Sequence, residues 1–107
     1  MAVSTIPSNG WRYIDTISIG DSADLPSKIN DVFIRISPGS DNNFYRCLSI
    51  PATILTSSFR YYIFGDYQSN GIGSQCILNC KTNAVKLVAV YDNGTSMTAS
   101  KADVYCR

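Results

Sequence analysis

The sequence predicts an all-β fold, an antiparallel β-sandwich of jelly-roll-like form with seven or eight short strands. Apolar side chains recur at a period of two along several strand-length segments, and no long segment carries the i, i+3, i+4, i+7 apolar stripe of an amphipathic helix. The breaks between these segments are rich in Gly, Pro, Asn, Asp and Ser, the residues of turns. The 107 residues, 45% hydrophobic and 16% charged, have the size and balance of one globular domain.

We expect residues 1–10 to be a flexible lead-in or a junction from a longer chain, and residues 11–107 to form a single β-sandwich domain. The first strand is expected in WRYIDTI, where alternation places four residues on one side: Trp11, Tyr13, Asp15 and Ile17. The next segment, SADLPSKIN (22–30), is expected to be a loop with at most one helical turn, because Pro26 lies too deep in it for a helix start.

Three further segments have the length and the β-branched or aromatic content of strands. In DVFIRIS, one face carries Val32, Ile34 and Ile36. In NFYRCLSI, alternation separates Phe44, Arg46, Leu48 and Ile50 from Tyr45, Cys47 and Ser49. In FRYYIFG, it separates Phe59, Tyr61 and Ile63 from Arg60, Tyr62 and Phe64. The turn-rich stretches SPGSDN (37–42) and GDYQSNGIG (65–73) follow the first and the last of these segments.

The stretch SQCILNCKTNAVKLVAV predicts a tight hairpin with Thr82 and Asn83 at its tip. In that register three pairs share one apolar face: Cys80 with Val85, Leu78 with Leu87, and Cys76 with Ala89. Asn83 tolerates the left-handed conformation that such turns use. The dipeptide Asn93-Gly94 signals a second hairpin turn. The last strand is expected in ADVYCR, with one face made of Ala102, Val104 and Cys106.

The four cysteines are interpreted first as buried free thiols that pack as small hydrophobic groups. Cys76 and Cys80 lie four residues apart on one predicted strand, which separates their α-carbons by about 13 Å. A disulfide needs about 7 Å or less, so these two cannot bond to each other. Cys47 and Cys106 lie on other strands, so a disulfide that uses one of them remains an alternative. A metal site is least favoured, because the C-x2-C knuckles of structural zinc sites are missing.

The composition argues against several classes of function. The chain has no histidine and its eight acidic residues are all Asp, which removes Ser-His and Cys-His nucleophile pairs and imidazole metal ligands. The net charge of +1 gives no reason to expect a nucleic-acid partner. The apolar runs are far shorter than the roughly 20 residues that span a bilayer. We therefore expect no enzyme, cofactor, metal or membrane insertion; a glycan depolymerase with an Asp pair is the least favoured alternative.

The predicted ligand site lies around the segment 59–73 and the turn after the predicted hairpin. Aromatic faces beside carboxylates and amides suit sugars, whose C–H faces stack on rings while their hydroxyls bind polar groups. The expected site residues are Tyr61, Tyr62, Asp66, Tyr67, Gln68, Asn70, Asp92 and Asn93. The alternative is that Tyr61 and its aromatic neighbours fill the sandwich and the polar loops are solvated turns.

Three stretches together resemble the C-terminal modules of bacteriophage tail fibres and related minor virion proteins: GWRYIDTISIGDSADLPSKINDVFIRI, NFYRCLSIPATIL and KLVAVYDNGTSMTASKADVYCR. The resemblance covers most of the chain from Gly10 onwards and rests on short patterns such as LP..IN.VFI and a terminal VY.R. It implies a β-sandwich tip, commonly a homotrimer, in the virion tail, made in the cytoplasm of the bacterial host. It also implies recognition of a host-surface receptor, often a glycan, and it supplies no catalytic motif.

Two functions follow as hypotheses. The first is a non-enzymatic receptor-binding module that recognises a host-surface receptor, a glycan before a protein. The second is a structural virion or assembly adaptor that binds another virion component through a sheet edge or an apolar face.

Overall fold

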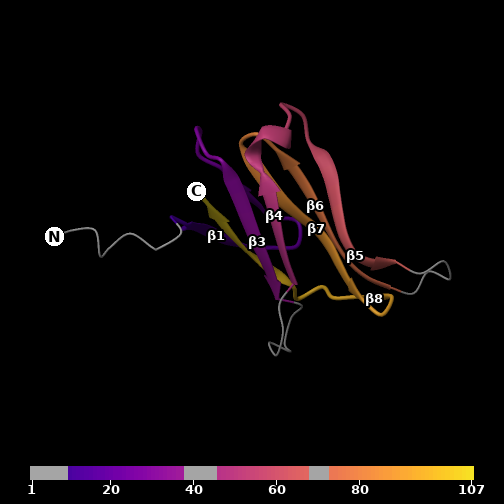
Figure 1. Cartoon of the computed structure of the whole chain (residues 1–107). Helices are drawn as coiled ribbons and strands as arrows, with labels where there is room; N and C mark the ends of the chain where they lie inside the picture. The colour runs from indigo at the N-terminus through magenta and orange to yellow at the C-terminus, as the bar shows by residue number, and fades with distance from the viewer. Residues whose placement is uncertain (1–9, 38–45, 68–72) are drawn as a thin grey trace.

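The structure, a computed structural model, describes residues 10–37, 46–67 and 73–107 and shows two antiparallel β-sheets packed face to face (Figure 1). The first sheet has the order β1-β9-β3-β4, with bounds Arg12–Ser18, Lys101–Cys106, Asp31–Ser37 and Arg46–Pro51. The second has the order β2-β7-β6-β5, with bounds Ser22–Asp24, Ala84–Asp92, Gly73–Lys81 and Arg60–Tyr67. The short strand β8 (Thr95–Ser96) pairs with β7, and the 3-10 helix η2 (Ala52–Ile54) follows β4.

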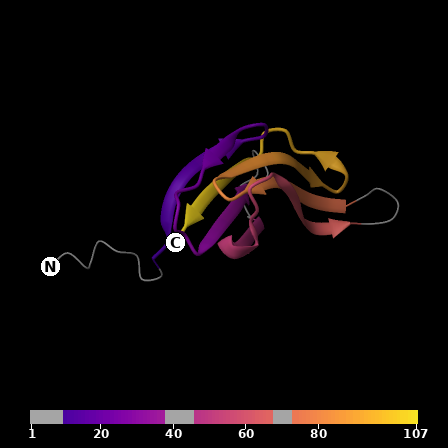
Figure 2. The ribbon, with the colours of Figure 1, turned by 90° about the horizontal axis from the view of Figure 1, so that it is seen from above.

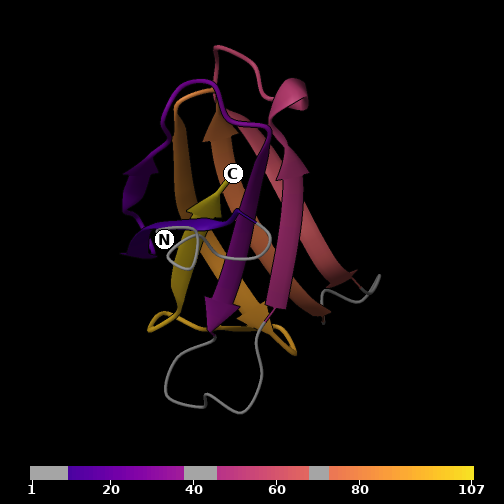
Figure 3. The same ribbon diagram turned by 60° about the vertical axis from the view of Figure 1, so that its left-hand side comes forward.

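The predicted all-β sandwich is confirmed, although the described residues form nine strands where seven or eight were expected, and a jelly-roll topology is not confirmed. Figure 2 shows the yellow C-terminal strand β9 between the indigo β1 and the purple β3, so the two ends of the described chain meet in one sheet. Figure 3 shows β3 and β4 in front of the orange strands of the second sheet.

The core lies between the inner faces of the two sheets. Val32, Ile34 and Ile36 of β3 are fully buried, as the alternation predicted. The inner positions of three other strands are buried as well: Ala102, Val104 and Cys106 of β9, Cys76, Leu78 and Cys80 of β6, and Val85, Leu87 and Val90 of β7. Burial of these apolar side chains at about 25 cal/mol per Å² supplies the main stabilisation of the sandwich.

The predicted register of the β6–β7 hairpin is correct near its tip and wrong beyond a bulge. Cys80 pairs with Val85 and Leu78 with Leu87, but Cys76 pairs with Val90 and not with Ala89. The ladder shifts between Ile77 and Leu78, because Val88 is an extra residue on β7. Val90 thereby takes the buried position that was predicted for Ala89.

A second bulge corrects the prediction for the first strand. Tyr13 pairs with Tyr105 and Asp15 with Val104, so Ile14 is the extra residue of β1. Tyr13 is therefore exposed on the outer face, whereas Ile17 is buried on the inner face. The four residues that strict alternation placed on one side of this strand are thus divided between the two faces.

The segment 22–30, expected to be a loop with at most one helical turn, begins with a short strand. Ser22, Ala23 and Asp24 pair with β7 at the edge of the second sheet. Ala23 and Leu25 are buried, and their spacing of two residues is that of a strand. Pro26 and the residues after it form no helix.

Both predicted hairpin turns are confirmed by the pairing on either side of them. Lys81 pairs with Ala84 around Thr82 and Asn83, although neither turn residue adopts the left-handed conformation expected of Asn83. Asn93 and Gly94 have φ values of 53° and 79°, as a tight β7–β8 turn requires. The expected turn at 37–42 and the alternation at Phe44 and Tyr45 lie outside the described residues, apart from Ser37 at the end of β3.

All four cysteines are free thiols, and three of them are buried. Cys47 is exposed because its position on β4 faces away from the core, opposite to the inward-facing Ile50. The expectation of packed thiols therefore holds for Cys76, Cys80 and Cys106 and is wrong for Cys47. Within the described ranges, no helix has the length and apolar character needed to cross a membrane.

Candidate ligand-binding site

Four aromatic side chains gather on the outer face of the first sheet, and we call this group the aromatic platform: Trp11, Tyr13, Phe33 and Tyr105. The strand register produces the group, because Tyr13 pairs with Tyr105 and Tyr105 pairs with Phe33 across three neighbouring strands. The ring centroids of Tyr13 and Tyr105 lie 5.6 Å apart in an edge-to-face arrangement. Phe33 lies 5.6 Å from Trp11 and 6.1 Å from Tyr105 with tilted planes. These geometries are the favoured ones for aromatic pairs and hold the rings in place.

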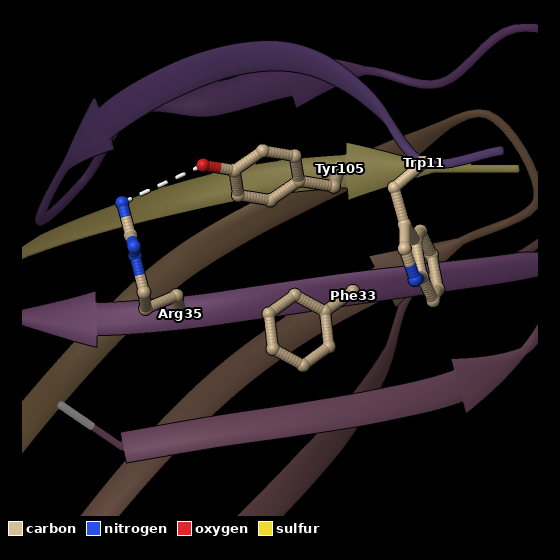
Figure 4. Close-up of a pocket in the computed structure, with 4 residues that line it drawn as sticks. All are labelled: Trp11, Phe33, Arg35 and Tyr105. Carbon is tan, nitrogen blue, oxygen red and sulfur yellow. Dashed lines mark hydrogen bonds between the residues drawn. The ribbon is translucent and has the colours of Figure 1, made fainter. Parts of the chain in front are cut away.

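A hollow of about 310 Å³ opens on this platform, lined by Trp11, Phe33, Arg35 and Tyr105. Figure 4 shows Phe33 and Tyr105 side by side along the sheet, with Trp11 at one end and Arg35 at the other. The hollow has the volume of a small ligand site, with apolar ring faces along its length and a guanidinium at one end.

A row of polar side chains borders the platform on one side. Arg35 donates from Nε and Nη2 to Oδ2 of Asp103, at 3.0 and 2.8 Å, and the Thr16 hydroxyl donates to Oδ1 at 2.7 Å. Arg35 also donates from Nη2 to the Tyr105 hydroxyl at 3.5 Å, and its guanidinium carbon lies 6.0 Å from that ring centroid. This row therefore offers hydroxyl, carboxylate and guanidinium groups in fixed positions.

A second ion pair borders the platform on its other side. Arg107 donates from Nε to Oδ2 of Asp31 at 3.1 Å, and its guanidinium carbon lies 4.3 Å from the Trp11 ring centroid. Stacking of a guanidinium on an indole holds both groups in place. The platform is thus a strip of rings between two ion pairs, Arg35–Asp103 and Arg107–Asp31.

The backbone positions of the two aspartates on this surface are too far apart for the close carboxyl pair of a retaining glycosidase. Asp103 lies beside Arg35, and Asp31 lies four residues before Arg35 on β3, a separation of about 13 Å along the strand. Glycosidases hold their carboxyl groups about 5–9.5 Å apart. No cluster of three or more Cys or Asp that could hold a metal occurs among residues 10–37, 46–67 and 73–107. The arrangement suits the binding of a ligand by contact with aromatic rings and hydrogen bonds.

The structure separates the aromatic residues that the sequence predicted for the site. Tyr61 and Tyr62 point to opposite faces of β5: Tyr61 is 66% exposed on the outer face of the second sheet, whereas Tyr62 packs against the core and donates its hydroxyl to the carbonyl of Ile54 at 3.4 Å. The alternative that Tyr61 fills the sandwich is wrong. Asp66 and Tyr67 end β5, opposite Ser74 and Gly73, and their side chains lie outside the description. Gln68 and Asn70 also lie outside the described residues.

Asp92 and Asn93 belong to a network that joins the two sheets. Arg46 of β4 donates from Nη1 to the carbonyl of Tyr91 at 3.0 Å and from Nη2 to Oδ1 of Asp92 at 3.2 Å. The Ser74 hydroxyl donates to the same Asp92 oxygen at 3.0 Å and accepts from the Asn93 backbone N–H at 3.1 Å. The network thus uses the side chain of Asp92 and the backbone N–H of Asn93. Their role in ligand binding stays a prediction.

The platform residues were missed in the sequence because their meeting depends on strand order. Phe33 and Tyr105 lie 72 positions apart in the chain, and β9 enters the sheet between β1 and β3. The alternation alone does show that Phe33 and Tyr105 are not core positions of their strands, but it grouped Trp11 with the buried Ile17, because the sequence does not reveal the bulge at Ile14. That signal identifies outward-facing aromatic residues, but it does not show that they meet.

A second hollow, of about 420 Å³, lies at one end of the sandwich and is lined by Leu25, Pro26, Ser27, Lys28, Ile29, Ala52, Thr82 and Asn83. Among the described residues that line it, Lys28 is the one charged residue and is exposed, and none is aromatic. It therefore has fewer groups for specific recognition than the platform.

Comparisons of the chain with protein-family models, curated proteins and solved structures found no match. The function is therefore inferred from the platform and the residues around it.

Proposed function

We propose that the protein is a non-enzymatic binding module whose aromatic platform binds a glycan on a host cell surface. The observation that carries this proposal is the strip of four rings between the Arg35–Asp103 and Arg107–Asp31 ion pairs. The resemblance of the chain to tail-fibre modules supports a place at the tip of a phage virion.

The chemistry of a sugar ring fits this surface. One face of a pyranose carries mainly C–H groups, which stack favourably on aromatic rings, and its edge carries hydroxyls. A sugar that lies over Phe33 and Tyr105 would place hydroxyls near the donors of Arg35 and the acceptors of Asp103. Both polar groups are already oriented by their mutual hydrogen bonds, so little side-chain entropy is lost on binding.

The surroundings and the spacing of Asp31 and Asp103 favour binding over catalysis. Each carboxylate accepts a hydrogen bond from an arginine, and the backbone positions of the two aspartates lie about 13 Å apart along the strands. A retaining hydrolase needs carboxyl groups only about 5 Å apart.

A structural virion adaptor is the second candidate. Trp, Tyr and Arg are the residues that most often dominate protein–protein interfaces, and all three line the hollow on the platform. In that case the platform would bind a protein of the same virion, and the protein would not attach to cells.

The experiment is a screen of soluble host-surface glycans, followed by titration of the best monovalent ligand by calorimetry. We expect Phe33→Ala to weaken binding at least tenfold, or about 1.4 kcal/mol, because the floor of the hollow loses a ring. Tyr61→Ala is the matched control, because it removes an exposed ring from the opposite sheet and should leave the affinity unchanged.

Loss of binding in Tyr61→Ala with retention in Phe33→Ala would move the site to β5. Absence of binding to any host-derived glycan, together with co-purification of a virion protein that Phe33→Ala abolishes, would select the adaptor function. Circular dichroism and the unfolding midpoint of each variant establish that it is folded.

A further inference from the structure

The strand β5 is an unprotected edge of the second sheet. Figure 1 shows it at the outer margin of the molecule, and among the strands that the structure describes it pairs with β6 alone. It is eight residues long. Its outer-face residues Tyr61 and Ile63 are 66% and 60% exposed, the highest values among the large hydrophobic side chains described. An exposed, apolar edge strand presents unpaired backbone groups and invites pairing with another strand.

The other sheet edges carry the features that prevent such pairing. In the second sheet, β2 is only three residues long. In the first sheet, β1 contains the bulge at Ile14, and β4 ends at Pro51. Short strands, bulges and proline are the usual protections of an edge. Between Arg60 and Asp66, β5 contains only Tyr61, Tyr62, Ile63, Phe64 and Gly65, with no proline and no charge.

The sequence of β5 is complementary to itself in one antiparallel register. Suppose that two copies of the strand pair with Ile63 opposite Ile63. The numbers of any two residues that face each other then add up to 126. Arg60 then lies opposite the acidic Asp66 at both ends, and Tyr62 lies opposite Phe64. Opposite charges and aromatic pairs are stabilising cross-strand neighbours.

Gly65 also favours this register. Its φ of +117° and the nearby Ser74 carbonyl oxygen leave no room for a side chain, so none covers the backbone of the strand at this position. The register places Tyr61 of the second copy opposite this glycine, and an aromatic ring across from an edge glycine covers the exposed backbone. A shift by two residues would lose this pair and both charge pairs.

We propose that β5 pairs antiparallel with β5 of a second copy of this chain, about a two-fold axis at Ile63. The axis is perpendicular to the sheet, so the two second sheets join into one continuous sheet. The aromatic platform remains open, because it lies on the outer face of the other sheet. Both platforms of the dimer face the same direction.

The first test compares Ile63→Lys with Ile54→Lys in sedimentation or light-scattering measurements over a range of concentrations. Wild-type protein is expected to form a dimer. Ile63→Lys should weaken it at least tenfold, because two ammonium groups meet at the axis. Ile54 is 53% exposed and lies in η2. Its contact with β5 is made by its backbone carbonyl, which accepts from the Tyr62 hydroxyl at 3.4 Å and is retained in Ile54→Lys, so this variant should leave the dimer intact. A wild-type monomer at about 1 mM, or a trimer that Ile63→Lys leaves intact, would overturn the proposal.

The second test examines the register by exchanging its charges. Arg60→Asp and Asp66→Arg should each weaken the dimer, because each places like charges opposite one another twice. The double variant Arg60→Asp/Asp66→Arg restores opposite charges and should recover most of the wild-type affinity. If the double variant is as weak as the two single variants combined, the register is wrong.

Discussion

At the scale of single residues, Gly65 shows how one backbone position can depend on the absence of a side chain. Its φ of +117° lies in the region that L-residues avoid, and a Cβ there would collide with the carbonyl oxygen of Ser74 on β6. Gly20 has a similar φ of +93°, but nothing lies within 4 Å of its Cβ position. Substitutions at the two glycines therefore distinguish the cost of a positive φ, which both share, from the cost of a collision with β6, which only Gly65 has.

We expect Gly20→Ala to lower the free energy of unfolding by about 1 kcal/mol, the cost of the positive φ alone. Gly65→Ala should lower it by about 3 kcal/mol, because β5 must also move away from β6. Urea unfolding at constant pH measures both values. Equal losses would show that the β5–β6 ladder absorbs the added methyl group.

The buried thiols make the stability of the protein depend on pH. Burial raises the pKa of the Cys80 thiol from 9.0 to about 12. Burial also raises the pKa of Cys76, against the lowering effect of a hydrogen bond and charge from Arg46. Both thiols are therefore protonated in the folded protein at neutral pH and are poor nucleophiles there.

Cys80 should make the protein less stable as the pH rises from 9 to about 12. In that window the unfolded chain ionises this thiol and the folded chain does not, so the free energy of unfolding falls by about 1.4 kcal/mol per pH unit. Below pH 9 the contribution is fully present. The measurement compares unfolding curves of wild-type protein and Cys80→Ala across this range. Parallel pH profiles would contradict the assignment, since the variant lacks the titrating group.

At the scale of elements, the two sheets are joined by more than their apolar faces. Arg46 of β4 reaches across the margin of the sandwich to the carbonyl of Tyr91 and the carboxylate of Asp92 on β7. The side chain of Arg46 is 19% exposed and that of Asp92 is 42% exposed. Partial exposure weakens the ion pair between Arg46 and Asp92. The hydrogen bond from Arg46 to the Tyr91 carbonyl therefore supplies much of the stabilisation that Arg46 provides.

Arg46→Met should lower the free energy of unfolding by about 1–2 kcal/mol, because it leaves the Tyr91 carbonyl and Asp92 without this donor. Lys101→Met is the control: Lys101 is exposed, and among the described residues its amine donates to Ser18 at 3.2 Å, within the first sheet. Lys101→Met should lower the free energy of unfolding by less than about 0.5 kcal/mol. A double-mutant cycle with Asp92→Ala measures the coupling across the sheets, and a coupling near zero would assign the effect to the backbone contact alone.

At the scale of the whole molecule, the platform and β5 lie on different sheets and can act together. A dimer through β5 would present two platforms to one cell surface, and linked weak sites gain avidity by orders of magnitude. The trimer that the resemblance implies would also give avidity, but through another surface of the chain.

Ile63→Lys should therefore leave the affinity for a soluble monovalent glycan unchanged and weaken binding to a glycan-coated surface by about 100-fold. Ile54→Lys should change neither value. Surface plasmon resonance on glycan surfaces of low and high density provides the measurement. An equal loss for the soluble and the immobilised ligand would place Ile63 in the ligand site instead of at a dimer axis.

Alternation along single strands was predictable from the sequence, because neighbouring side chains of a strand point to opposite faces whatever the strand pairs with. This rule correctly placed Val32, Ile34 and Ile36 in the core, and local turn chemistry correctly placed the turns at Thr82-Asn83 and Asn93-Gly94. It failed at Ile14 and Val88, because a bulge arises from the fit of two strands and not from the preference of one.

The order of the strands was decided only by the tertiary structure. The position of β9 between β1 and β3 depends on the burial of the whole core, a sum over contacts that are distant in the chain, and no short segment encodes it. That order brings Phe33 beside Tyr105 and Arg35 beside Asp103. The sequence by itself therefore determined the sandwich and which side of most strands faces inward, whereas the candidate site exists only because long-range packing set the outward faces of three strands side by side.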